Sequence, residues 1–270
     1  MAEYRAATDA FVAARPDSHT MMLTVVDGLT RRGPQAFGAG TPFFGWWREP
    51  DGTVAGALVC TPPYPLMLST LPAAAVAALG AAFATDARVA GAGGFNARRA
   101  DAQALAAACG RPTKVAEELR LYRLETLVPP DPAPSGAARP ATPDDLPLVR
   151  EWYDAFSRDT GQPAPVPDTA VLDRMSFGGL LLWEDGGVPV SMAGWSRPVQ
   201  GTSRIAPVYT PPELRGRGYA AGATAAATVA AQRAGGTEVL LFTDLSNPTS
   251  NGIYLRIGYR PVEDRLYVLA

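Results

Sequence analysis

Hydrophobic and polar positions alternate most clearly in the second half of the chain. Apolar residues from Leu146 to Phe156 recur at helical spacing, which predicts a helix with one buried face. Three apolar runs of strand length follow, and Gly186-Gly187 between the first two is typical of a hairpin turn. A shorter helix is predicted before them. In order, this helix and the three strands are predicted at 168–175, 180–185, 188–196 and 202–210.

The last sixty or so residues continue the alternation. An alanine-rich segment after Gly218 has high helix propensity and ends at a glycine pair. The apolar run 238–244 fits a buried strand. Asn247 and Pro248 are a typical cap and first residue of a helix, which we expect to end at Gly258, before a closing strand.

The first half repeats this order of elements without repeating the sequence. The pattern predicts helices and strands, with a glycine-rich loop at 90–96. The order suggests a duplicated fold. The predicted helices are 21–29, 72–84 and 100–110, and the predicted strands are 43–49, 53–61, 65–72 and 119–127.

A proline-rich segment, 128–140, separates the two halves. It lacks periodicity, as an extended linker does. We therefore predict an N-terminal domain over 1–128, a linker over 129–138 and a second domain over 139–270, each of ordinary domain size.

Composition excludes several classes of function. The net charge of −2 gives no basic excess for binding nucleic acid or a membrane surface. No apolar run of about 18 residues is present, and the N-terminus lacks the features of a signal peptide, so a cytoplasmic protein is expected. Cys60 and Cys109 have no metal-binding spacing and are expected to be buried thiols, and the one histidine, His19, is expected to start a helix or face solvent. We expect no metal.

The segment Leu214-Arg-Gly-Arg-Gly-Tyr-Ala-Ala-Gly222 lies between a predicted strand and a predicted helix. Gly216 and Gly218 let the backbone bend and let a ligand approach closely. The first turn of a helix presents unpaired N–H groups and a positive dipole end, which together bind phosphate. Arg215 and Arg217 can add charge-assisted contacts. Alone, this pattern is equally consistent with a plain strand–helix connection.

Two motifs in this half are shared with a known family. Residues 215–220 resemble the R/Q-x-x-G-x-G/A pyrophosphate loop of the GNAT acyl-CoA-dependent N-acyltransferases. Residues 241–262 resemble the same family's fifth strand, following helix and closing turn. The positions matching its N-P-x-S-N-x-x-Y-x-x-x-G-Y/F run are Asn247, Ser250, Asn251, Tyr254, Gly258 and Tyr259.

The resemblance, which covers about residues 138–270, implies a fold and an activity. The fold is α+β: two tandem GNAT-like domains, each a mixed, mostly antiparallel sheet flanked by helices. Acetyl-CoA lies between the family's fourth and fifth strands and donates its acetyl group to the amine of a small molecule. Tyr254 is the implied general acid for the departing thiolate. The implied acetyl-CoA-binding residues are Val208, Tyr209, Thr210, Arg215, Gly216, Arg217, Gly218, Tyr219, Ala220, Ala221, Asn247 and Ser250.

Other features leave alternatives open. The general base is Glu151, Asp154, Glu184 or a chain of water molecules. The first half has no glycine-rich loop before its helix at 72–84, which resembles tandem GNAT proteins whose first module has lost acyl-CoA binding. The alternatives to an acetyltransferase for small amines are a non-catalytic acyl-CoA sensor and an enzyme for another acyl-CoA, a hydroxyl or a protein. We expect a monomer, with a homodimer as the alternative.

Overall fold

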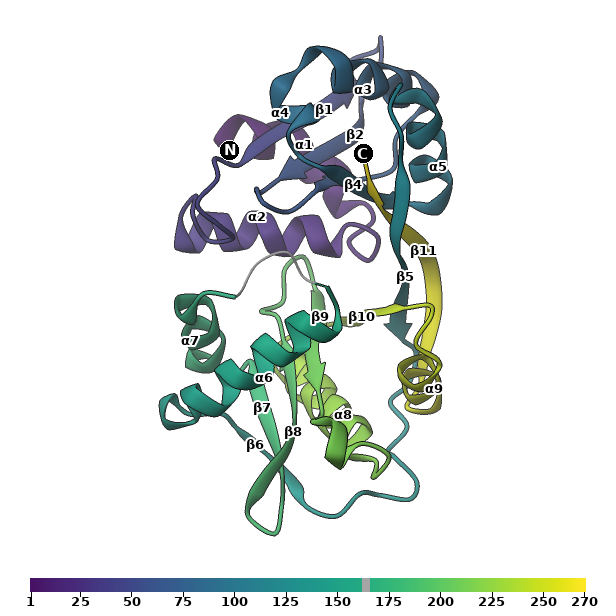
Figure 1. The fold of residues 1–270 in the computed structure, drawn as a ribbon. Coiled ribbons are helices and arrows are strands. Elements are labelled where there is room, and N and C mark those ends of the chain that lie inside the picture. The colour runs from purple at the N-terminus through teal and green to yellow at the C-terminus, as the bar shows by residue number, and fades with distance from the viewer. Residues whose placement is uncertain (162–165) are drawn as a thin grey trace. The chain divides into compact units, whose positions relative to one another are not determined.

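The computed structural model describes residues 1–161 and 166–270 (Figure 1). The contacts divide the chain into two compact units. Unit 1 comprises Met1–Leu121, Asp244–Ser246 and Glu263–Ala270, and unit 2 comprises Tyr122–Thr243 and Asn247–Val262. Each is a mixed α/β unit with helices on its strands, as predicted.

Unit 1 is built on a mixed sheet. Strands β1 (Phe43–Arg48), β2 (Val54–Cys60) and β3 (Leu66–Leu68) are antiparallel neighbours, and β3 is parallel to β4 (Gly94–Arg98). Residues of β11 (Tyr259–Leu269) pair antiparallel with β4. The helices are α1 (Ala2–Ala13), α2 (Thr20–Arg32), α3 (Ala73–Thr85), α4 (Ala87–Ala90) and α5 (Arg99–Ala108), and β5 (Lys114–Leu124) follows them.

The alternation of side chains along β2 explains why helices cover both faces of this sheet. Ala57 and Val59 are buried with residues of α1 and α2, whereas Cys60 is buried with residues of α3 and α5. Successive residues of a strand point to opposite faces, so one strand contributes to two cores. Both cysteines are buried and free, as the sequence predicts.

One expectation for unit 1 was wrong. Residues 90–96 are not all loop, because β4 begins at Gly94 and four of its five residues are buried. A side chain at Gly94 would collide with the Val268 carbonyl, 2.1 Å from its Cβ position, so this glycine serves the close approach of β11 rather than a turn. His19 is the N-cap of α2 and is buried, so of the two alternatives expected for it the helix start is the one that the structure has.

Unit 2 follows the predicted pattern closely. Strands β7 (Leu180–Asp185), β8 (Val188–Trp195) and β9 (Thr202–Tyr209) are antiparallel, and β9 is parallel to β10 (Glu238–Asp244). Buried residues of α6 (Leu146–Asp159) and α7 (Asp168–Ser176) pack on one face. Those of α8 (Tyr219–Arg233) and α9 (Pro248–Arg256) pack in the other core.

The segment predicted as a linker contributes to unit 2. Its end forms β6 (Ala137–Pro140), which pairs antiparallel with β7 from Ala137↔Glu184 onward. The compact units divide in the sequence between Leu121 and Tyr122, and Glu263–Ala270 belongs to unit 1. The reason is the pairing of β11 with β4, a contact between distant parts of the sequence that local periodicity does not reveal.

Candidate functional site

Strands β9 and β10 separate partway along their length. Their pairing runs from Glu238↔Thr202 to Leu241↔Ile205 and then ends, although both strands continue. Beyond this point β9 stays paired with β8 through Ala193↔Val208 and Met192↔Tyr209. The edge of β9 that faces β10 is therefore left without ladder partners from Ala206 on, and an unpaired edge can bind an extended amide-containing ligand.

The glycine-rich turn leads from β9 into α8. Gly216 and Gly218 have φ values of 80° and 82°, the left-handed region that favours glycine, and Gly218 is the N-cap of α8. No backbone or side-chain acceptor in the described chain bonds the N–H groups from Gly218 to Ala221. A Cβ at Gly216 would meet no atom within 4 Å. The turn therefore combines free N–H donors with open space, which suits an anion.

The two arginines of this turn differ in their partners. The Arg215 guanidinium donates to the Thr210 carbonyl (2.9 Å) and to the Asp159 carboxylate (2.8 Å), so it fastens the turn to β9 and α6. Arg217 is exposed and makes one long contact, 3.5 Å, to the Glu213 carbonyl. Arg217 is therefore the freer of the two cations.

Residues 134–135, just before β6, pack against the first turn of α8 and bond the side chain that anchors it. The Tyr219 hydroxyl donates to Asp185 (2.5 Å), which also accepts from Ser135 (2.7 Å). A Cβ at Gly222 would lie 2.9 Å from both Pro134 and Trp183, so a glycine is needed there for this packing. The Tyr219 side chain is thus a structural anchor, and its backbone N–H is what faces the turn. The sequence gives no local sign of this contact.

The end of β9 presents backbone groups rather than side chains. Tyr209 is buried against Trp152, with ring centroids 6.1 Å apart, and its carbonyl accepts from Ser191 Oγ (2.9 Å). The Thr210 hydroxyl shares a hydrogen bond with the same Ser191 hydroxyl (2.8 Å). Val208, one residue before, lies on the edge described above. The side chains of Tyr209 and Thr210 therefore pack and bond within the protein, and only their backbone groups are available to a ligand.

Helix α9 carries the other predicted residues. Asn247 is its N-cap, and its side-chain oxygen accepts from the Ser250 N–H (3.0 Å), as the Asn-Pro pair predicts. The Tyr254 ring is 8% exposed and lies between Tyr122 and Tyr259, at centroid distances of 6.4 and 6.2 Å. Within the described residues its hydroxyl has no hydrogen-bond partner. Burial raises the pKa of Tyr254 to about 12, so the residue is a neutral phenol.

The three carboxylates considered as bases lie in different surroundings. Glu151 is exposed on α6. Glu184 accepts from Arg139 (2.7 Å), which also binds Asp145, so Glu184 is part of an ion-pair network beside β6. Asp154 is half-buried on α6.

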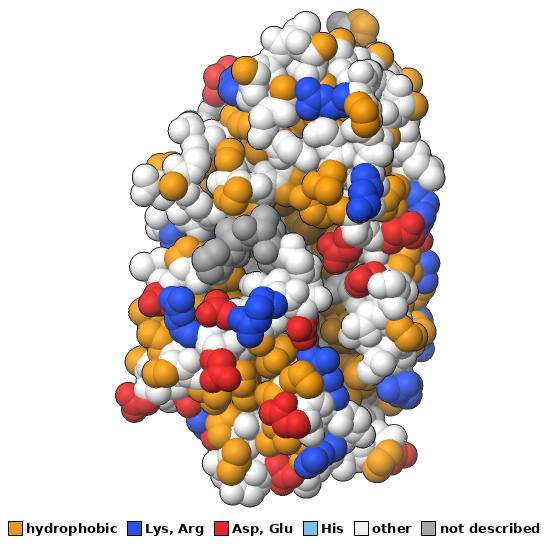
Figure 2. Space-filling view, in the orientation of Figure 1, with side chains coloured by type: hydrophobic (Ala, Val, Ile, Leu, Met, Phe, Trp, Pro, Cys, Tyr) orange, Lys and Arg blue, Asp and Glu red, His pale blue; other side chains and the backbone are white. Residues whose placement is uncertain are grey.

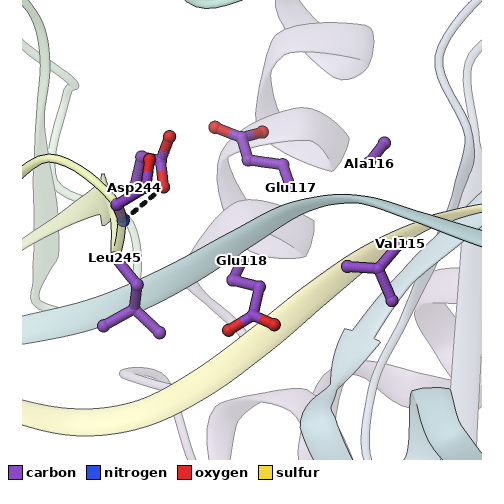
Figure 3. A pocket seen from close by; sticks show the side chains of 7 residues that line it. Val115, Ala116, Glu117, Glu118, Asp244 and Leu245 are labelled. Atoms are coloured by element: carbon purple, nitrogen blue, oxygen red, sulfur yellow. Dashed lines mark hydrogen bonds between the residues drawn. The ribbon is translucent and has the colours of Figure 1, made fainter.

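Unit 1 contains a pocket of about 570 Å³ that the sequence did not suggest (Figure 3). The Glu117 carboxylate, from β5, reaches toward Asp244 at the end of β10 (Figure 3). Burial and, less strongly, the charge of Asp244 raise the pKa of Glu117 to about 7. The lining residues are Val115, Ala116, Glu117, Glu118, Asp244, Leu245 and Ser246.

Replacing Glu117 by glutamine should stabilise the protein at pH 8. The folded state holds the Glu117 proton more tightly than the unfolded chain, whose glutamate has a pKa near 4.5. The contribution of protonated Glu117 to the free energy of unfolding is therefore fully present below about pH 4.5, and it is lost as the pH rises through about 7. Glutamine does not ionise, so we expect a gain of about 1–2 kcal/mol at pH 8, a figure reduced because the side chain is only half-buried. Urea unfolding at pH 5 and pH 8 measures it.

Glu118→Gln is the matched control. Glu118 is the next residue of β5 and lines the same pocket, but it is exposed and paired with Arg99 at 2.8 Å. It should give no gain at pH 8. If the stability of Glu117→Gln fell between pH 5 and pH 8 as steeply as that of the wild type, the raised pKa would be assigned to the wrong residue.

On the face drawn in Figure 2, basic and acidic side chains are interspersed. Across the described ranges, no helix is long and apolar enough to span a membrane. No group of three or more histidine, cysteine or carboxylate side chains in those ranges has a metal-binding arrangement.

Comparisons with known proteins agree with the motifs. Residues 146–259 match the model of the acetyltransferase (GNAT) family. No match was found among curated protein sequences. A GCN5-related N-acetyltransferase from Sphaerobacter thermophilus is 19% identical, with a TM-score of 0.61 over 83% of this chain and 79% of its own. One from Kribbella flavida is 20% identical, with a TM-score of 0.61 over 93% of this chain and 95% of its own.

A third similar structure is a tandem GNAT protein from the clavulanic acid biosynthesis pathway. It is 16% identical, with a TM-score of 0.55 over 91% of this chain and 86% of its own. At these identities the structures show a shared fold, and the family model adds the match over β9, the glycine-rich turn, α8 and α9. The chain therefore contains a domain of the acetyltransferase (GNAT) family at residues 146–259, and it shares the fold of GNAT structures.

Proposed function

We propose that this protein transfers an acetyl group from acetyl-CoA to the amine of a small molecule. The observation that carries the proposal is the free N–H groups from Gly218 to Ala221, which lie directly after the unpaired edge of β9. One site binds anions and the other binds amides, and acetyl-CoA carries a pyrophosphate followed by an amide-containing arm.

The described residues suggest how acetyl-CoA is held. The pyrophosphate accepts from the N–H groups of residues 216–221, and Arg217 supplies a cation, since Arg215 is already engaged. The pantetheine arm pairs with the edge of β9 at Val208–Thr210. Asn247 and Ser250, at the start of α9, flank the arm on the side of β10.

The chemistry needs a nucleophile, a carbonyl and a stabilised leaving group. The amine nitrogen attacks the thioester carbonyl carbon, and a β9 N–H near Val208 stabilises the oxyanion that forms. When the C–N bond is complete, the C–S bond breaks and the sulfur leaves with the electron pair. The Tyr254 hydroxyl donates its proton to that sulfur, and the proton lost by the amine returns to Tyr254 through solvent.

The raised pKa of Tyr254 indicates how its hydroxyl assists the departure of the CoA sulfur. A phenol with a pKa of about 12 holds its proton more tightly than a thiol of ordinary pKa, about 8.5. Proton transfer is therefore not favourable by itself, and Tyr254 acts first as a hydrogen-bond donor to the sulfur as charge develops. The free hydroxyl supports this assignment because no other group competes for its proton.

The N-terminal unit is, in this proposal, a module that has lost acetyl-CoA binding. The connection between β3 and α3 is Ser69-Thr70-Leu71-Pro72, and Pro72 is the N-cap of α3. The Ser69 hydroxyl bonds the Thr70 carbonyl within this connection. No glycine is present to give the left-handed turn seen at Gly216 and Gly218. Unit 1 then has a structural role.

Thermal unfolding with and without acetyl-CoA tests the proposal. A ligand at 100 times its Kd stabilises the folded state by about 2.7 kcal/mol. For a protein of this size we expect the midpoint to rise by about 5–10 °C. Free CoA should give most of the shift, since the proposed contacts are to its pyrophosphate and arm. No shift at millimolar acetyl-CoA would contradict the proposal.

A further inference from the structure

Arg204 is a cation that forms no ion pair with a carboxylate of the described chain. It lies on β9 opposite Leu240, one position before the last pair of β9 with β10, and its side chain is half-buried. Its Nη1 is buried without a hydrogen-bond partner. Burial, with a smaller effect from Arg174, lowers the pKa of Arg204 to about 10.

A second arginine lies beside it. Because Ile205 belongs to the core under α8, Arg204 points to the opposite face of β9, which α6 and α7 cover. Arg174, on α7, donates to the Ala206 carbonyl, two residues farther along β9. The charge of Arg174 also acts on Tyr153, buried on α6. Two cations therefore lie where β9 and β10 begin to separate.

The nearby carboxylates do not neutralise this pair. Asp173, next to Arg174 on α7, is paired with Arg197 instead. Glu238, on β10, lies opposite Thr202 and forms no ion pair with Arg204. Within the described ranges neither Arg174 nor Arg204 is in an ion pair. Residues 162–165 are Gln-Pro-Ala-Pro and supply no carboxylate in the sequence.

An unpaired guanidinium in such surroundings weakens the fold. Burying a cation without a counter-ion is unfavourable, and removing it for an apolar side chain is often neutral or stabilising. A ligand that supplies the missing anion would offset this cost. The position, at the separation of the strands, is where the proposed function requires the acetyl group and the incoming amine to meet.

We propose that Arg204, with Arg174 beside it, binds a carboxylate of the acceptor, so that the acceptor is an amine that carries a carboxylate, as an amino acid does. The inference rests on the proposed acetyl transfer and specifies its substrate class. A carboxylate fits one guanidinium through two parallel hydrogen bonds. A ligand with a single negative charge suits the site, because part of the Arg174 guanidinium is already occupied by its hydrogen bond to the Ala206 carbonyl and Arg204 is the main cation left to bind it. Polycationic amines would be repelled.

The test compares acids with their amides. Wild-type protein and Arg204→Met are assayed for thiol release from acetyl-CoA with amino acids, with the matching carboxamides and with spermidine. We expect amino acids to be preferred over carboxamides by at least about tenfold in kcat/KM. In Arg204→Met that ratio should fall to near one. Arg233→Met is the control, because Arg233 is an exposed arginine at the far end of α8.

Two binding measurements separate this inference from the proposed function. The acetyl-CoA shift in midpoint should be the same in Arg204→Met and wild type, and its absence from both would overturn acetyl-CoA binding itself. N-acetyl amino acids should raise the wild-type midpoint, and their amides should not. Without ligand, the midpoint of Arg204→Met should equal or exceed that of wild type. Equal use and equal binding of acids and amides by the wild type would overturn the carboxylate site.

Discussion

Gly216→Asp should weaken acetyl-CoA binding by about 100-fold and leave the fold intact. Aspartate tolerates the left-handed backbone better than most residues do, and the Cβ position at Gly216 is open. A carboxylate near a helix N-terminus also favours the helix. The same carboxylate would repel the pyrophosphate and compete for its N–H donors, each such bond being worth about 1.5–3 kcal/mol. Titration calorimetry with acetyl-CoA measures the change.

Gly235→Asp is the matched control for this substitution. Gly235 follows the C-terminus of the same helix, has a φ of 96° and likewise has no atom within 4 Å of its Cβ position. It should bear the same backbone strain with no effect on the Kd. If Gly216→Asp bound acetyl-CoA as tightly as Gly235→Asp does, the pyrophosphate would have to lie elsewhere.

Tyr254→Phe should lower kcat by about 100-fold or more while the Kd for acetyl-CoA stays unchanged. A positioned general acid typically contributes about 100- to 10,000-fold to the rate. The hydroxyl has no partner to lose among the described residues, so its removal should not reduce stability. Because the pKa of Tyr254 is raised to about 12, its ionisation should not appear as a limb in the pH profile below about pH 11. Steady-state kinetics from pH 6 to pH 10 measures the loss of kcat and shows whether the pH profile has a limb from Tyr254.

Tyr259→Phe gives the opposite pattern and is the control. Its ring lies beside Tyr254, but its hydroxyl is bonded to Thr228 at 2.6 Å in the core. Losing that bond should lower stability by about 1 kcal/mol with little effect on kcat. A Tyr254→Phe enzyme with wild-type kcat would exclude the phenol as the acid. The proton would then reach the sulfur from water.

The sequence predicted local features of this protein well. The ends of β7 and β10 agree with prediction because apolar runs bounded by turn residues mark buried strands. The cap at Asn247 and the turn at Gly216 and Gly218 were also predicted, since their chemistry is contained in a few consecutive residues. These are the features that depend on neighbours in the chain.

Features formed by distant residues were missed. Pro134 against Gly222 and Glu117 facing Asp244 join segments that no periodicity connects. Arg204 was not recognised because its importance lies in the absence of a counter-ion, which only the packing of α7 on β9 reveals. Strand β4 was missed because its one glycine, Gly94, serves a close approach of strands, and the same residue type more often indicates a loop.

The pairing of the last strand, β11, with β4 has a consequence for biosynthesis. Unit 1 includes Glu263–Ala270, which pair through β11 with β4, yet these residues are translated after all of unit 2. The first half of the nascent chain therefore waits on the ribosome with one side of β4 unpaired, a state open to non-native strand pairing. Folding of unit 1 and then unit 2 in the order of synthesis is therefore not possible, because unit 1 is complete only after residues 263–270 have been synthesised.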